Sequence, residues 1–174
     1  SHRFKCIEDI TKRVDNMNDD YYRTVRGYQL ANRQEGQLTS ALEDYMEMTF
    51  RLCKEKGYAR IGQLSDILHV RPSSVSRMIA RLAELGFVKY DRYGVIQLTE
   101  AGRDLGEYLV FRHEVVERFL TLIGCTDPLE ETELIEHSLQ PATVKRLKTL
   151  IDFFKSDPDI RNEFDEFRKS NRKL

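Results

Sequence analysis

The stretch from residue 40 to residue 98 contains the feature that most restricts the fold of this chain. Ser40, with Glu43 three residues later, predicts a capping box that opens a helix. Pro72 suits the first turn of a later helix, and Gly94 suits a hairpin turn. Apolar periodicity predicts helices over 40–57, 61–69 and 73–85, followed by strands over 87–90 and 95–98. Helix, turn, helix and hairpin in this order are typical of a winged helix-turn-helix.

The charges of the chain are divided between two regions. The formal net charge of −1 by itself argues against a nucleic-acid binder. Residues 51–92, however, contain nine basic and four acidic residues, whereas residues 113–140 contain seven acidic residues and one arginine. A basic region is suited to phosphates and an acidic one to cations, so we expect different partners for the two regions.

The helix predicted over residues 73–85 is the candidate DNA-contacting element. In a helix-turn-helix, the second helix enters the major groove and presents short polar or long basic side chains near its start. Apolar residues at Val75 and Ile79 would face the core. In the alternative interpretation, this helix does not contact DNA: the serines only cap it and the arginines are solvated. The predicted DNA-contacting residues are Arg71, Ser73, Ser74, Ser76, Arg77, Arg81, Arg92 and Tyr93, the last two at the hairpin tip.

The rest of the chain is predicted to be helical, so the fold class is mainly α. A long helix from Thr99 to about Ile123 has an apolar stripe of near-heptad spacing, which is typical of a helix that packs against a partner. Further helices are expected from Pro128 to Leu139 and after Pro141 and Pro158. We predict a helical extension of unknown role over 1–37, a winged-helix DNA-binding domain over 38–98, and an all-helical dimerisation and metal-binding domain over 99–174.

Acidic and histidine side chains occur at spacings that suit metal binding. Glu133, Glu136 and His137 would share one face of a helix, and Asp44 and Glu47 are three residues apart on another. His113 falls on the apolar face of the long helix, where a lone histidine is more often a core residue than a ligand. Taken singly, the acidic groups are equally consistent with solvated surfaces.

A cation becomes necessary if these groups converge. Four carboxylates within a few ångströms of one another would repel strongly unless positive charge joined them. Oxygen ligands with two imidazoles and no thiolate suit Mn²⁺ or Fe²⁺ better than a structural zinc site. Spacing alone does not show that the groups converge.

Enzyme motifs are absent from the sequence. Glu117 stands where the HExxH motif of zinc proteases needs its second histidine, and neither His113 nor His137 has an acid three residues before it. We therefore expect no enzyme. Two rival functions stay open here, a regulator of the MarR type that senses an organic ligand, and a di-metal hydrolase with a nucleic-acid module.

Cysteine usage and hydropathy bear on the compartment. The three cysteines, Cys6, Cys53 and Cys125, are far apart and form no CxxC pair, which suits a reducing compartment. No window reaches the roughly 18 apolar residues of a membrane span. We expect a cytoplasmic protein with no membrane partner and no small organic substrate.

Five blocks in order resemble the diphtheria toxin repressor family, in its manganese-responsive branch. They are residues 42–47 (LEDYME), 56–60 (KGYAR), 71–75 (RPSSV), 112–114 (RHE) and 133–137 (ELIEH). The iron-sensing branch has Met where Asp44 stands and Cys where Glu133 stands, so both positions resemble the manganese form. The resemblance implies a metal site formed by Asp44, Glu47, His113, Glu133, Glu136 and His137.

The same resemblance implies a manganese-activated transcriptional repressor. Such a protein would bind double-stranded operator DNA as a homodimer and would control metal-ion uptake genes. Two Mn²⁺ ions per subunit are implied, with Fe²⁺, Zn²⁺, Co²⁺ or Cd²⁺ as substitutes.

Overall fold

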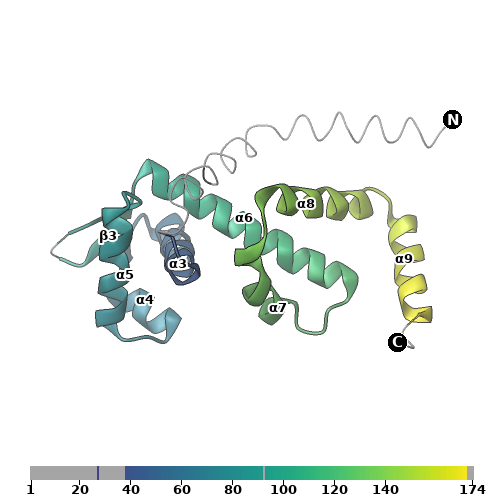
Figure 1. The fold of residues 1–174 in the computed structure, drawn as a ribbon, viewed down its shortest axis with the longest axis horizontal. Helices are drawn as coiled ribbons and strands as arrows, with labels where there is room; N and C mark the ends of the chain where they lie inside the picture. Colours follow the sequence, from purple (N-terminus) through teal and green to yellow (C-terminus); the bar gives the residue numbers. More distant parts are fainter. Residues whose placement is uncertain (1–26, 28–37, 92, 172–174) are drawn as a thin grey trace. The chain divides into compact units, whose positions relative to one another are not determined.

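The computed structural model describes residues 38–91 and 93–171 together with Gly27. The chain divides into two compact units, with the boundary between Phe111 and Arg112 inside a long helix (Figure 1). The helical extension predicted for residues 1–37 lies outside the described residues, apart from Gly27. No helix in the described part of the chain has the length and apolar character needed to cross a membrane.

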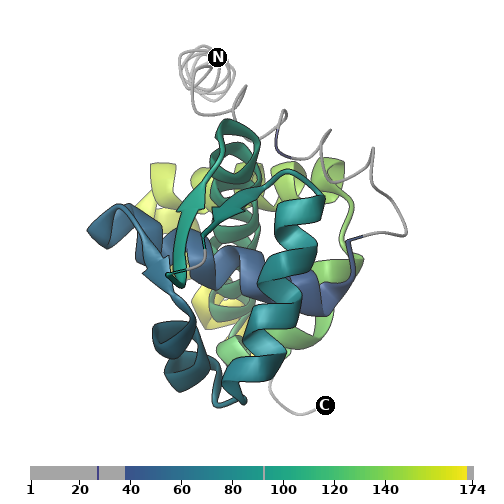
Figure 2. The same cartoon turned by 90° about the vertical axis from the view of Figure 1, so that its left-hand side faces the viewer.

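The first unit has the predicted order of helices and hairpin. Its three strands pair antiparallel in the order β1-β3-β2 (Figure 2). Strand β1 was not predicted, because two residues are too few to show an alternating pattern. The elements are α3 (Ser40–Lys56), β1 (Ala59–Arg60), α4 (Ile61–Leu68), α5 (Pro72–Glu84), β2 (Val88–Tyr90), β3 (Val95–Leu98) and the start of α6 (Glu100–Ile123).

The start of α3 corrects the predicted capping box. The N-cap is Thr39 rather than Ser40, and the Thr39 hydroxyl accepts a hydrogen bond from the Leu42 amide at 3.3 Å. Thr39 has the extended backbone that an N-cap needs, whereas Ser40 is already helical. At the other end, Gly57 takes the left-handed conformation with φ of 79° and ends the helix.

The core of the first unit joins its three helices to the sheet and to α6. Met46 of α3, Ile79 of α5 and Ile96 of β3 are fully buried in it, together with Leu105 of α6. Figure 2 looks toward this unit and shows α3 passing behind α5. This packing leaves the opposite face of α5 in solvent.

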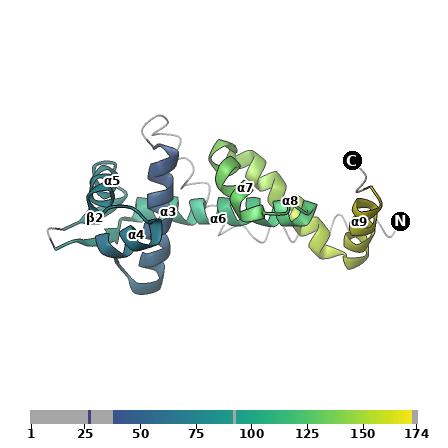
Figure 3. The same cartoon turned by 90° about the horizontal axis from the view of Figure 1, so that it is seen from below.

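The second unit contains the end of α6 and the remaining helices. Its buried residues include Val116 and Leu120 of α6 and Val144 and Ile151 of α8 (Pro141–Ser156). Figures 1 and 3 show α7 and α8 along the second half of α6. The elements are α7 (Pro128–Ile135), the 3-10 helix η1 (Glu136–Ser138), α8 (Pro141–Ser156) and α9 (Pro158–Ser170).

The helix predicted from Pro128 to Leu139 is shorter than expected. It ends at Ile135 and continues as the tighter η1, so Glu133 lies on α7 whereas Glu136 and His137 lie on η1. Pro141 prevents the helix from continuing beyond this turn, because the residue before a proline is pushed out of the helical region. Gln140 is extended accordingly, with ψ of 144°.

Candidate metal centre and nucleic-acid interface

The exposed face of α5 is the candidate nucleic-acid interface. Val75, Ile79 and Leu82 turn into the core, which orients the polar residues of the helix outward. The structure leaves Ser76 half-buried. The predicted DNA-contacting residues that it leaves exposed on or beside α5 are Arg71, Ser73, Ser74, Arg77 and Arg81.

The first turn of α5 combines amide donors with exposed polar side chains. Arg71 is its N-cap, and the Arg71 carbonyl accepts from the amides of Ser74 and Val75. Further along, Arg81 forms an exposed ion pair with Glu84 at 2.8 Å. Exposed ion pairs of this kind contribute little, so the Arg81 guanidinium can exchange Glu84 for a phosphate.

The β2–β3 hairpin extends away from the helices of the first unit (Figure 3). Its turn is held by the Asp91 carboxylate, which accepts from the amides of Tyr93 and Val95 at 2.8 and 3.0 Å. Tyr93 is 69% exposed. Arg92, the other predicted contact at the tip, lies outside the described residues.

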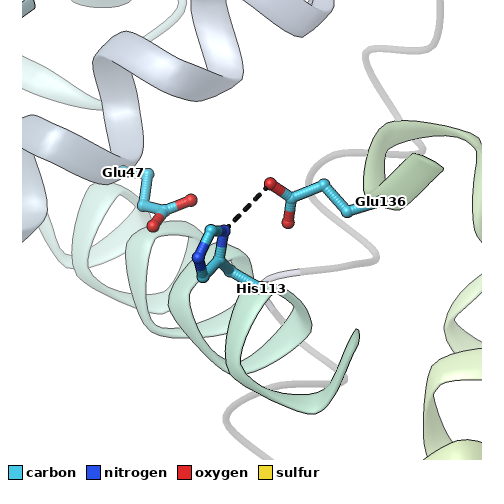
Figure 4. Close-up of side chains that lie close together, drawn as sticks. All are labelled: Glu47, His113 and Glu136. Carbon is cyan, nitrogen blue, oxygen red and sulfur yellow. Dashed lines mark hydrogen bonds and ion pairs between the residues drawn. The ribbon is translucent and has the colours of Figure 1, made fainter. Parts of the chain in front are cut away.

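The second unit brings three of the predicted metal ligands together. His113 Nδ1 lies 3.1 Å from Glu136 Oε1 (Figure 4) and 3.6 Å from Glu133 Oε1. Glu136 is the most buried of them, with 1% of its surface exposed. A carboxylate is buried in this way only where positive charge or hydrogen bonds compensate the loss of water.

The contacts of the two histidines define which ring nitrogen carries a proton. A carboxylate only accepts hydrogen bonds, so His113 Nδ1 donates to Glu136. His137 is arranged in the opposite sense. Its Nδ1 lies 3.0 Å from Arg112 Nη2, and a guanidinium only donates, so His137 Nδ1 accepts.

Arg112 is a site residue that the sequence interpretation missed. Its guanidinium is buried and contacts Glu136 Oε2 at 3.4 Å as well as His137. The sequence did contain a signal for it. Arg112 follows Leu109 by three residues and precedes Val116 by four, so a charged residue occupies a position of the apolar stripe and requires a buried partner.

The remaining predicted ligands, Asp44 and Glu47, belong to α3 of the first unit. Asp44 is exposed and Glu47 is half-buried, one turn further along the helix. The Glu47 carboxylate, also drawn in Figure 4, pairs with Arg51 at 2.7 Å. Both carboxylates are therefore on one helix face, as the spacing predicted.

The donor set fits a hard divalent cation. The second unit supplies carboxylate oxygens and imidazole nitrogens in contact with one another, and the predicted set contains no thiolate. Such a set suits Mn²⁺ or Fe²⁺. The chemistry of the residues is therefore compatible with the cofactor class that the sequence predicts.

Two family models match the chain in succession. The model for the iron dependent repressor N-terminal DNA binding domain matches residues 37–96. The model for the iron dependent repressor metal binding and dimerisation domain matches residues 99–165. Together they span both units of the structure.

Individual relatives are similar over most of the chain. The HTH-type transcriptional regulator MntR of Oceanobacillus iheyensis is 40% identical over 121 residues, which are 68% of this chain and 82% of the relative. The protein of the same name from Bacillus subtilis is 35% identical over 133 residues, which are 75% of this chain and 94% of the relative.

The similarity to solved structures covers a smaller share of those structures than of the relatives above. The structure of the manganese regulator SloR matches with a TM-score of 0.57 and 26% identity, over 64% of this chain and 54% of that one. The crystal structure of T. acidophilum IdeR matches with a TM-score of 0.53 and 27% identity, over 60% of this chain and 51% of that one. The chain thus spans about half the length of these two structures.

Proposed function

The chain belongs to the iron-dependent repressor family, the family of metal-dependent transcriptional repressors that its sequence resembles, and on that premise we propose that manganese activates it. Members of this family are transcriptional regulators rather than enzymes. We further propose that it binds operator DNA as a cytoplasmic homodimer and controls metal-ion uptake genes. Residues 38–98 would bind DNA, and residues 99–174 would form the dimer and hold metal.

The buried contact between His113 Nδ1 and Glu136 Oε1 is the observation that carries the metal assignment. We propose two Mn²⁺ ions per subunit, with Fe²⁺, Zn²⁺, Co²⁺ or Cd²⁺ as substitutes. When bound, the cations supply the positive charge that lets several carboxylates share a site. The proposed ligands are Asp44, Glu47, His113, Glu133, Glu136 and His137.

The proposed ligands come from both units, and this gives a mechanism. Asp44 and Glu47 belong to α3, which packs against α5 in the first unit. Ligand sharing would restrict the freedom of α3, and with it the position of α5, relative to the dimerisation helices. Two α5 helices in a dimer would then be held near the spacing of one turn of DNA, about 34 Å. If metal and DNA both bind this arrangement of the dimer preferentially, metal binding raises the affinity for DNA, and DNA binding raises the affinity for metal.

Duplex DNA selected from a random pool with the Mn²⁺-loaded protein provides the test. Its affinity is measured by fluorescence anisotropy with Mn²⁺ and after chelation, and we expect metal to strengthen binding about 5- to 150-fold. Glu136→Gln should abolish the response, whereas Glu114→Gln, which changes an exposed carboxylate on α6, should preserve it.

Equal affinity with and without metal would contradict the proposal. It would favour instead a regulator of the MarR type that responds to an organic ligand. A response that persists in the Glu136→Gln variant would contradict the proposed ligand set while leaving metal activation intact.

A further inference from the structure

Arg112 lies between two of the proposed metal ligands, Glu136 and His137, and its side chain contacts both. Its Nε is 3.4 Å from Glu136 Oε2, and its Nη2 is 3.0 Å from His137 Nδ1. Arg112 is 3% exposed and Glu136 is 1% exposed, so water contributes little to either. The arginine supplies positive charge to a buried carboxylate in this arrangement.

The atoms that Arg112 contacts are the ones a divalent cation would use. A neutral imidazole has a single in-plane lone pair, and in His137 that lone pair is at Nδ1, where the arginine donates. Glu136 likewise directs Oε2 at the guanidinium. A metal that binds His137 Nδ1 has to displace the arginine from it, and a metal that binds Glu136 Oε2 has to share that oxygen with the guanidinium.

We propose that Arg112 competes with metal for Glu136 and His137 and thereby lowers the affinity of the site, a role that rests on the proposed function. In the metal-free protein, the guanidinium stabilises the carboxylate and the imidazole. Metal binding has to overcome this pairing and also brings a cation close to a positive side chain. Arg112 therefore adjusts the metal concentration at which the protein responds.

A purely supporting role predicts the opposite effect. Residues that only hold metal ligands in place typically lower metal affinity about 10- to 100-fold when they are removed. A competitor raises the affinity when it is removed. The direction of the change therefore separates the two roles.

The test compares Arg112→Gln with the unmodified full chain. Mn²⁺ affinity is measured without DNA, by the electron paramagnetic resonance signal of free Mn²⁺, and the melting temperature of the metal-free protein is measured in parallel. We expect Mn²⁺ affinity to rise about 5- to 150-fold and the metal-free melting temperature to fall. Arg118→Gln is the matched control, because Arg118 is exposed on the same helix and pairs only at the surface with Glu114 in the contacts described; neither quantity should change.

Arg112→Lys keeps the test decisive if Arg112→Gln does not fold without metal. A lysine ammonium retains the charge but cannot contact both ligands in the manner of a planar guanidinium, so a smaller rise in affinity is expected. Unchanged or weaker Mn²⁺ binding by the folded variants would overturn the inference. Failure of the unmodified protein to bind Mn²⁺ would instead overturn the proposed function, so the two failures are distinguishable.

Discussion

Neighbouring residues of α5 differ in burial, so substitutions can separate the proposed DNA contacts from core packing. Val75 is fully buried, Ser76 is half-buried and Arg77 is exposed. A change at Val75 would affect the core of the first unit. A change at Arg77 removes a charge from the surface, so its effect on DNA binding is not confounded by packing.

Arg77→Ala should weaken binding to the selected duplex by about 1–3 kcal/mol, because a phosphate or base contact is lost. Mn²⁺ affinity should stay the same, since Arg77 is distant in sequence from every proposed ligand and lies on the solvent face of α5. Anisotropy and Mn²⁺ titration measure the two quantities. Arg146→Ala, an equal loss of exposed charge on α8, is the control. A parallel loss of metal binding would contradict the assignment of α5 to DNA alone.

Cys53 should be chemically inert in the folded protein. Its thiol is buried and donates to the Ile96 carbonyl at 3.7 Å, and burial raises its pKa from 9.0 to about 11. Iodoacetamide at pH 8 should therefore modify Cys53 only after unfolding, as mass spectrometry of its peptide would show. Above pH 9 the unfolded thiol ionises while the folded thiol keeps its proton, so stability should decrease as pH rises toward 11. Rapid modification of the native protein would contradict this prediction.

At the scale of elements, the start of α6 is positioned by close backbone contact. The Thr99 hydroxyl accepts from the Gly102 amide at 3.0 Å and donates to the Gly86 carbonyl at 2.7 Å, which ties the start of the helix to the end of α5. A Cβ on Gly102 would lie 1.9 Å from the Phe87 carbonyl oxygen. The helix therefore approaches the sheet more closely than any residue with a side chain permits.

Gly102→Ala should destabilise the protein by about 1–3 kcal/mol, because the backbone of α6 or Phe87 has to move. This cost exceeds the gain of about 1 kcal/mol that alanine brings to a helix interior. Gly62→Ala in α4, where a Cβ meets nothing within 4 Å, should be neutral or stabilising. Thermal unfolding of both variants measures the difference. Equal stability of the two would show that the contact at Gly102 relaxes without cost.

At the scale of the whole molecule, charge and apolar surface are distributed unequally. The basic region of residues 51–92 belongs to the first unit, whereas the acidic region of residues 113–140 belongs to the second. The second unit also exposes large apolar side chains, among them Leu129, Leu134 and Phe167. Exposed apolar side chains of this size favour association with another protein surface, in agreement with the dimerisation domain of the family.

The protein should sediment with about twice the 20.5 kDa mass of one chain. Chelation should lower its affinity for the selected duplex without dissociating the dimer, because the apolar surface that favours association contains no proposed metal ligand. Analytical ultracentrifugation with and without Mn²⁺ checks this prediction. A monomer at the concentrations where DNA binds would contradict the proposed homodimer.

Most of the fold could be predicted because the signals for its elements are local. Apolar periodicity, Pro72, Gly57 and the turn at Gly94 each act within a few residues. Within the described residues, the predicted helices and hairpin are confirmed apart from their ends. The errors occurred at ends, where Thr39 replaces Ser40 as the cap and where the helix before Pro141 tightens into η1. Helix ends depend on small energy differences between alternative hydrogen bonds, and these are poorly encoded in residue spacing.

The chain by itself determined the residue types of the candidate site, since carboxylates, imidazoles and their spacing are properties of the sequence. Only the tertiary structure decided that Arg112 meets Glu136 and His137, which follow it by 24 and 25 residues. Burial of a charge is favourable only when a partner from another element arrives with the right geometry, and no local pattern specifies that arrival.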